Sequence, residues 1–81
     1  MEVVETEGKH GIVVFFNKEK FVAPKETMTG GELRELFRVP SENKLFREEH
    51  GHGPDTLITP DMAVHLKNGD KFYDLPPGKV G

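Results

Sequence analysis

The residues that could do chemistry stand at the end of the chain, after its last apolar run. None of the six final residues favours a helix or a sheet ladder strongly: they are Pro76, Pro77, Gly78, Lys79, Val80 and Gly81. Glycine has no Cβ to obstruct a nucleophile that approaches its carbonyl carbon. The sequence therefore predicts a flexible arm, residues 76–81, that presents the carboxylate of Gly81.

A second group of candidate ligands lies in a glycine-rich segment. His50 and His52 are separated by one residue, with Glu48, Glu49 and Asp55 nearby. A zinc site needs fixed ligands and a supporting second shell, and two histidines on a glycine loop provide neither. We expect a solvated loop here and no metal.

Paired carboxylates offer a third kind of chemistry. Asp61, Asp70 and Asp74 could act together as general acid and base. Each of them falls at a turn or cap, where aspartate is common because it hydrogen-bonds the backbone. No serine, histidine and aspartate stand at a spacing that favours a nucleophile. The sequence predicts no enzyme and no cofactor.

The composition bears on the classes of partner that the protein can bind and on the cellular compartment in which it is expected. The 81 residues suffice for one small domain, and 14 acidic against 11 basic residues, scattered along the chain, disfavour nucleic acid as a partner. The absence of cysteine suits a reducing cytosol. The first residues are acidic, unlike a signal peptide, and no apolar run approaches the roughly 20 residues of a membrane span. We expect a cytoplasmic protein without membrane contact.

A folded unit at residues 12–75 must hold these groups, after a flexible leader of residues 1–11. Ile12–Phe16 is a run of β-branched and aromatic residues, which predicts a buried strand. A polar turn over residues 17–20 then leads to a second strand at residues 21–23. Closing this hairpin with Phe16 opposite Phe21 sets its register.

That register predicts two faces for the hairpin. The larger apolar set, facing the core, is Ile12, Val14, Phe16, Phe21 and Ala23. The smaller set is Val13, Phe15 and Val22. Together with Phe46 from a later strand, it is a candidate partner surface, or else these side chains cover one another or pack under the leader.

The helix is predicted from a capping box. Thr29 and Glu32 stand at the N-cap and N3 positions. Leu33, Leu36 and Phe37 then lie on one face for about three turns, until Pro40 ends the helix.

The paired glycines Gly30 and Gly31 have two interpretations. They mark a tight passage across the sheet, or an anion site at the helix N-terminus. The fuller phosphate-binding pattern is missing, so we favour the first.

The second half adds a strand at residues 43–48, with Leu45 and Phe46 on opposite faces, an extended step or tight turn at residues 56–60, and a final strand at residues 71–75. A turn at residues 68–70 should place Leu66 opposite Phe72. The order predicts an α+β fold, the ββαβ(β) arrangement of the β-grasp: a mixed four- to five-stranded sheet packed on one face by a single helix.

The sequence resembles the ubiquitin-like β-grasp proteins, and more closely the bacterial multiubiquitin-domain family. The segments that carry this resemblance are residues 12–16, 22–25, 29–33, 45–46, 48–55 and, above all, 59–72. It covers nearly the whole chain after Gly11. It departs from ubiquitin in ending on Val80-Gly81, where ubiquitin has two glycines, and in having one copy of a domain that the family often repeats.

The resemblance implies a protein modifier of a bacterial ubiquitination-like pathway, a kind of system associated with antiphage defence. An activating enzyme would adenylate Gly81 and pass it through thioesters to a target nucleophile by way of a conjugating enzyme. A JAB-type metallopeptidase would trim or remove the modifier. The tail that these enzymes would read is Pro76, Pro77, Gly78, Lys79 and Val80. Two alternatives remain: a non-covalent β-grasp binding module, and a sulfur carrier with a thiocarboxylate at its C-terminus.

Overall fold

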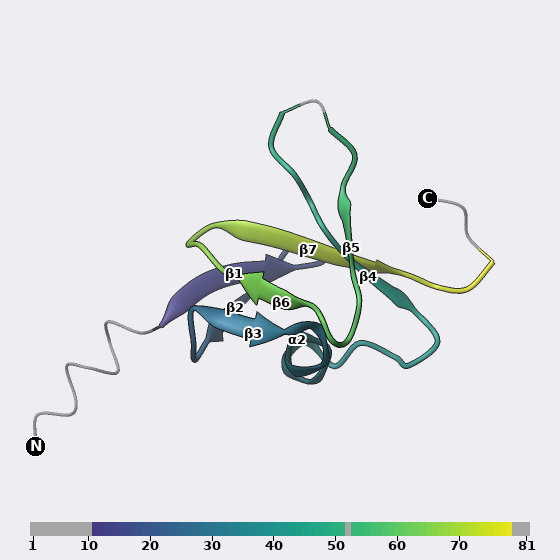
Figure 1. The fold of residues 1–81 in the computed structure, drawn as a ribbon, viewed down its shortest axis with the longest axis horizontal. Helices are drawn as coiled ribbons and strands as arrows, with labels where there is room; N and C mark the ends of the chain where they lie inside the picture. Colours follow the sequence, from purple (N-terminus) through teal and green to yellow (C-terminus); the bar gives the residue numbers. More distant parts are fainter. Residues whose placement is uncertain (1–10, 52, 79–81) are drawn as a thin grey trace, which may run out of the picture.

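The apolar run after Gly11 forms a strand beside the centre of a mixed five-stranded sheet, in the computed structural model that describes residues 11–51 and 53–78 (Figure 1). The elements in chain order are β1 (Ile12–Phe16), β2 (Glu19–Ala23), β3 (Thr27–Thr29), α2 (Gly30–Phe37), β4 (Lys44–Arg47), β5 (Thr56–Ile58), β6 (Ala63–His65) and β7 (Asp70–Leu75). The sheet order is β2-β1-β7-β4-β5, with β1 and β7 parallel and the other neighbours antiparallel. The fold is α+β, as predicted, with one helix among the described residues, and its strand order is compatible with a β-grasp.

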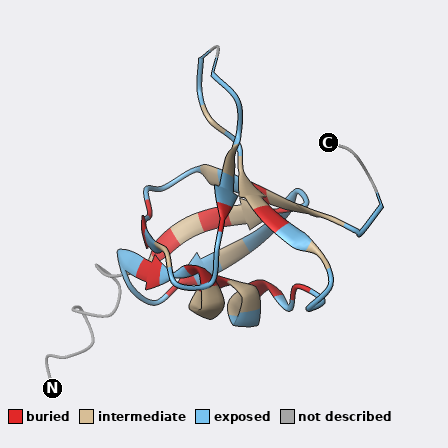
Figure 2. Cartoon of the chain, turned by 45° about the vertical axis from the view of Figure 1, so that its right-hand side comes forward, coloured by how far each residue is buried: buried red, intermediate tan, exposed pale blue. Residues whose placement is uncertain are grey.

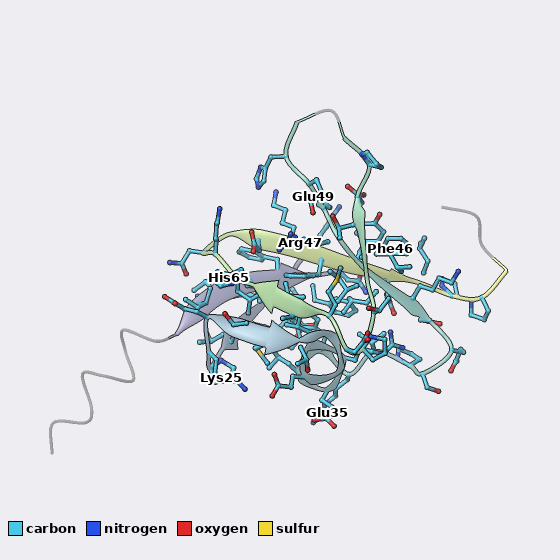
Figure 3. The ribbon with its side chains drawn as sticks, viewed as in Figure 1. Lys25, Glu35, Phe46, Arg47, Glu49 and His65 are labelled. Carbon is cyan, nitrogen blue, oxygen red and sulfur yellow. The ribbon has the colours of Figure 1, made fainter. Side chains whose placement is uncertain are left out.

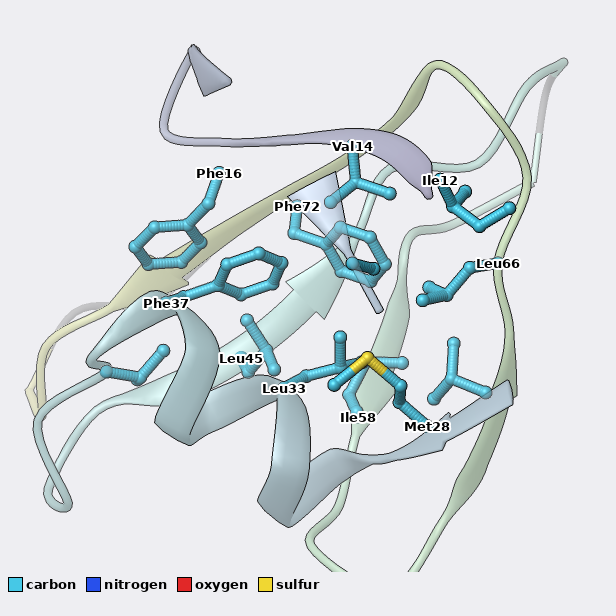
Figure 4. Packing of buried hydrophobic residues seen from close by; sticks show 13 residues of the cluster. Ile12, Val14, Phe16, Met28, Leu33, Phe37, Leu45, Ile58, Leu66 and Phe72 are labelled. Atoms are coloured by element: carbon cyan, nitrogen blue, oxygen red, sulfur yellow. The ribbon is translucent and has the colours of Figure 1, made fainter. Parts of the chain in front are cut away.

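The core lies between α2 and the face of the sheet that the helix covers (Figure 4). Val14, Leu33 and Leu45 are completely shielded from solvent, and Phe72 is 2 % exposed. The Phe37 ring from the helix stacks on Phe16 with centroids 4.8 Å apart. Figure 2 shows the buried positions alternating with partly exposed ones along β1, the pattern of a strand with one covered face.

The hairpin faces are confirmed, but the predicted register is wrong by two residues. Phe16 pairs with Glu19, and Val14 pairs with Phe21. The turn contains only Asn17 and Lys18, whose φ angles of 50° and 72° are left-handed, as a two-residue hairpin turn requires. A shift of two residues preserves the faces because side chains alternate with a period of two.

The predicted pairing of Leu66 with Phe72 is also wrong. The amide of Leu66 donates to the Glu26 carbonyl (2.7 Å), continuing the β3–β6 pairing, which the sequence did not predict. The turn at residues 68–70 instead contacts β1, where Asn68 Oδ1 accepts from the amide of Val13 at 2.8 Å. β7 therefore enters the sheet between β1 and β4.

Helix α2 begins where the sequence predicts and ends early. The capping box is present: the Glu32 amide donates to Thr29 Oγ1 (3.1 Å), and the Thr29 amide donates to Glu32 Oε1 (2.9 Å). The helix has eight residues, about two turns instead of three. Arg38 ends it with a left-handed φ of 60°, before Pro40 can act.

A tight passage is confirmed for Gly30, against the backbone of residue 59, and not for Gly31, where a Cβ would make only an ordinary contact. A Cβ on Gly30 would lie 1.9 Å from the Thr59 carbonyl oxygen. The amides of Gly30 and Gly31 donate to the carbonyls of Met62 (2.8 Å) and Pro60 (2.9 Å). Amides that are already bonded to backbone carbonyls are not available to an anion.

Arg34 fixes the connection from α2 to β4. Its Nη2 lies 2.9, 3.3 and 2.8 Å from the carbonyl oxygens of Pro40, Ser41 and Asn43. We predict that Arg34→Met lowers the free energy of unfolding by about 1–2 kcal/mol, because carbonyls beside a lost charged donor are left unpaired. Arg34→Lys, which keeps the charge, should cost less. Urea denaturation of both variants measures the difference, and equal stability of Arg34→Met and the parent would contradict this role.

Candidate functional site

The face of the sheet opposite α2 carries the predicted partner residues. Residues paired across neighbouring strands point to the same face, and the register assigns to this open sheet face Val13, Phe15, Lys20, Val22, Lys44, Phe46, Leu57, Lys71, Tyr73 and Leu75. Val22 and Leu57 are the large apolar side chains most exposed among the described residues, at 57 % and 43 %. The open sheet face is therefore an apolar surface with lysines distributed across it.

Three of the four predicted residues lie together on β1 and β2. Val13 pairs with Val22, while Phe15 stands between Lys20 on β2 and Lys71 on β7. A pocket of about 610 Å³ opens beside this row, lined by Phe15, Asn17, Lys18, Glu48, Lys71, Phe72 and Tyr73. The pocket has a half-buried aromatic wall and a charged rim. It therefore suits a partner that inserts an apolar side chain and places polar groups around it.

The fourth residue, Phe46, lies on the other side of β7 (Figure 3). Its ring stacks on Tyr73 with centroids 5.3 Å apart and planes 10° apart. Leu57 is its partner on β5. Tyr73 thus connects the Phe15 side and the Phe46 side into one surface.

The base of the β4–β5 loop is tied to this surface by a hydrogen-bond chain. The Tyr73 hydroxyl donates to Asp55 Oδ2 (2.6 Å), and the Glu49 amide donates to Asp55 Oδ1 (3.1 Å). Glu49 Oε2 in turn accepts from Thr56 and Arg47. The hydrogen bond to Asp55 and, to a lesser extent, burial raise the pKa of Tyr73 to about 12 from 10.0. The same bond lowers the pKa of Asp55.

We predict that Asp55→Asn lowers the pKa of Tyr73 from about 12 toward 10.0, because the negative charge beside the phenol is removed. Tyr73 is the only tyrosine and the chain has no tryptophan, so ultraviolet absorbance titration reports this group alone. The raised pKa in the folded state means that the neutral phenol stabilises the fold. That contribution is complete below pH 10.0 and is lost as the pH rises through about 12. If the midpoint of the Tyr73 titration in Asp55→Asn equals that of the parent, the contact between Tyr73 and Asp55 is contradicted.

The final strand leaves the sheet beside a clamp made by Asp74. Its two carboxylate oxygens accept from the side-chain amides of Asn17 (3.0 Å) and Asn43 (2.8 Å). These bonds join the β1–β2 turn and the segment before β4 to the end of β7. The anchored strand is followed by solvent-exposed residues, and Figure 1 shows the chain running outward from β7 there.

The predicted tail is only partly described. Pro76, Pro77 and Gly78 are exposed, and Gly78 has a φ of 87°, which glycine adopts without strain. Lys79, Val80 and Gly81, including the residue that would carry the reactive carboxylate, lie outside the described residues, as do residues 1–10 of the predicted leader.

Two carboxylates of the glycine-rich segment, those of Glu49 and Asp55, are engaged in the bonds above. Glu49 contacts Thr56 and Arg47, Asp55 contacts Tyr73, and His50 is exposed. Within residues 11–51 and 53–78, no three His, Cys, Asp or Glu side chains are grouped for a metal ion. His52 lies outside the described residues.

Sequence reasoning missed Lys71, Tyr73, Leu57 and the Asp74 clamp. The alternation of Lys71, Phe72 and Tyr73 could have assigned Lys71 and Tyr73 to the open sheet face, because Phe72 is the buried member. The clamp joins residues 57 and 31 positions apart, and no local pattern indicates it.

Comparison of the chain with known protein families, with curated proteins and with solved structures gave no match. Among the residues that the structure describes, no helix combines the length and the apolar character needed to cross a membrane.

Proposed function

We propose that this chain is a ubiquitin-like protein modifier whose Gly81 carboxylate is the acyl donor. The strand order, with β7 parallel to β1 and central in the sheet, is compatible with a β-grasp and supports the ubiquitin-like assignment. The sequence resemblance over residues 12–72 supports the same family. The partners are an activating enzyme, a conjugating enzyme and a JAB-type metallopeptidase in a bacterial pathway, with antiphage defence as its setting.

The proposed reaction has four steps. The carboxylate of Gly81 attacks the α-phosphate of ATP, forming an acyl-adenylate and releasing pyrophosphate. A cysteine thiolate of the activating enzyme attacks the acyl carbon and expels AMP, and the acyl group then passes to a cysteine of the conjugating enzyme. A target nucleophile finally displaces that thiolate, so each step after the adenylation exchanges one acyl bond for another.

The observation that carries the proposal is the exit from β7. A strand bonded on both sides and clamped at Asp74 is followed at once by exposed Pro76, Pro77 and Gly78. This arrangement holds the domain rigid while the following residues are accessible to an enzyme. Gly78 also lacks a side chain that would obstruct a narrow channel.

The test uses ATP and the activating enzyme encoded in the same genome. We expect a thioester-linked adduct that thiols cleave, formed by the parent and absent when Gly81 is deleted. The control is Glu35→Ala, an exposed position on α2 away from the open sheet face, which should charge normally. Adduct formation by the Gly81 deletion would contradict the proposal. Intact mass spectrometry separates the sulfur-carrier alternative, which adds the mass difference between sulfur and oxygen.

The exposed apolar side chains favour a second candidate, a non-covalent binding module that uses the open sheet face. Phe46→Asp would introduce a charge beside Tyr73 and Leu57 and should abolish a stable complex, because a carboxylate is costly to desolvate there. Glu35→Lys, on the exposed side of α2, is the control (Figure 3). In this case deletion of residues 76–81 leaves binding intact, which distinguishes the module from the modifier.

A further inference from the structure

The turn that leads into β7 contains an asparagine followed by a glycine, and both residues are exposed to water. In such a pair the backbone nitrogen of the glycine can attack the side-chain carbonyl carbon of the asparagine. Glycine hinders this attack least, because it has no Cβ beside the nitrogen. Asn68 is the only asparagine of the chain that a glycine follows, since Asn17 and Asn43 each precede a lysine. The step from Asn68 to Gly69 is therefore where this chain can react with itself.

The reaction requires base and water as its only co-reactants. The Gly69 nitrogen loses its proton and forms a bond to Asn68 Cγ, and the bond from Cγ to Nδ2 breaks and releases ammonia. The product is a cyclic imide, which water opens at either carbonyl. Opening at Cγ gives aspartate with the ordinary backbone. Opening at the main-chain carbonyl gives isoaspartate, whose backbone runs through Cβ and Cγ and is longer by one methylene group.

The folded sheet holds both reacting groups against Val13. The Gly69 amide donates to the Val13 carbonyl (2.8 Å), and Asn68 Oδ1 accepts from the Val13 amide (2.8 Å). The second bond polarises the Asn68 carbonyl, which by itself favours attack. The first bond decides the outcome, because the nitrogen cannot attack while its proton is bonded to the Val13 carbonyl. Both bonds break when β1 separates from the turn before β7, and the two groups are then free to react.

The two products differ in how they fit this turn. Aspartate at position 68 keeps an oxygen that can accept from the Val13 amide. In isoaspartate the added methylene displaces the Gly69 nitrogen, so the two contacts with Val13 cannot form together. The turn is also closed by the Asp70 amide on the Lys67 carbonyl (3.0 Å) and by the Lys67 amide on Asp70 Oδ2 (2.9 Å). Both bonds span the altered linkage, and β7 begins at Asp70, so isoaspartate disrupts the entry of this strand into the sheet.

We propose that Asn68 and Gly69 form a self-modification site that the folded domain keeps closed and that separation of β1 from β7 activates. A chain that has formed isoaspartate cannot restore the native entry of β7, and the edges of β1 and β4 that β7 covers are then exposed. The site converts transient opening of the domain into a lasting covalent change, which limits the lifetime of chains that open often. This inference goes beyond the proposed function and does not depend on the reaction at Gly81.

The test follows ammonia loss at each asparagine of the full chain, by peptide mapping and mass spectrometry at mildly alkaline pH. The chain has three asparagines and no glutamine, so each such mass change belongs to Asn17, Asn43 or Asn68. In urea that unfolds the chain, we expect Asn68 to convert well before the other two. Without urea its conversion should be about tenfold to a hundredfold slower, the factor that the loss of two hydrogen bonds implies. Equal rates in the folded and unfolded chain would overturn the closed state.

Two variants separate the chemistry from the fold. Gly69→Ala, measured in urea, places a Cβ beside the attacking nitrogen and should slow the conversion of Asn68 to the rate of Asn17. If Asn68 reacts equally fast in this variant, attack by the residue 69 nitrogen is refuted. Phe37→Ala, which loosens the helix from the sheet, should speed the conversion of Asn68 without urea, whereas Gly31→Ala should not. An unchanged rate in Phe37→Ala would show that opening of the sheet does not control the reaction.

The purified isoaspartyl chain tests the structural consequence. We expect its urea midpoint to lie clearly below that of Asn68→Asp, which has the same charge and the ordinary backbone. The amide signals of Val13 and Asp70 should differ between these two chains, because the contacts at the turn are lost in only one of them. An isoaspartyl chain as stable as Asn68→Asp would overturn the proposed disruption of β7. Failure of the isoaspartyl chain to refold, where Asn68→Asp refolds, would support it.

Discussion

Gly30→Ala is expected to lower the free energy of unfolding by about 3 kcal/mol, at the upper end of the usual cost of overpacking. The new Cβ would lie 1.9 Å from the Thr59 carbonyl oxygen and 2.7 Å from the Thr59 carbonyl carbon. Both are backbone atoms, so no rotamer change relieves the clash. The segment that carries Thr59 is also fixed, because the Met62 and Pro60 carbonyls accept from the first two amides of α2. The helix must move off the sheet, or β5 must shift.

Gly31→Ala is the matched control for this substitution. Its added Cβ would lie 3.5 Å from the Pro60 carbonyl oxygen, an ordinary contact, and alanine is the better helix former. We expect stability unchanged or raised by about 0.4–1 kcal/mol, as for glycine replaced without strain. Urea denaturation followed by circular dichroism measures both variants. Equal stability of the two would show that the backbones of α2 and residue 59 are not in close contact.

Phe37→Ala is expected to cost about 3–5 kcal/mol, the usual range for truncation of a buried aromatic side chain. The Phe37 side chain is 4 % exposed, and its ring centroid lies 4.8 Å from that of Phe16, 5.1 Å from Phe21 and 5.4 Å from Phe72. It is the contact through which the helix meets β1, β2 and β7 together. A domain of this size has only about 5–15 kcal/mol of total stability, so the variant should be partly unfolded at physiological temperature.

The neighbouring residue provides the comparison for Phe37. Leu36 is only partly buried against the core, so Leu36→Ala should cost clearly less. Phe37→Leu keeps most of the apolar volume and should recover much of the loss. Thermal unfolding with calorimetry ranks the three variants. A loss at Phe37→Ala no larger than at Leu36→Ala would contradict the central position of this ring.

The parts of the fold that could be predicted depend on residues close in sequence. The capping box needs only Thr29 and Glu32, three positions apart, and the structure has both of its bonds. The faces of β1 and β2 follow from strand periodicity, which survives a register error. The error itself arose because Asn17 and Lys18 both adopt left-handed φ angles, a property of two residues that the polar pattern of residues 17–20 does not reveal.

The parts that could not be predicted depend on long-range pairing. β3 and β6 have three residues each, with one buried residue in each strand, too few for a visible alternation. The Tyr73–Asp55 bond joins residues 18 positions apart, and the bonds of Asp74 span still more. The open sheet face could be predicted for Val13, Phe15 and Val22, while the lysines around Phe15 became neighbours only through the β1–β7 register.

The position of β7 has a consequence for the nascent protein. Of the five strands of this sheet, β7 is translated last, and it joins the β2-β1 pair to the β4-β5 pair. Until it emerges, two separate hairpins expose the edges that it will later bridge, and the Phe37 ring lacks its contact with Phe72. The ribosome must therefore have passed β7 before this domain can acquire its native sheet, and a stalled chain that stops short of Asp70 would be a substrate for chaperones and proteases.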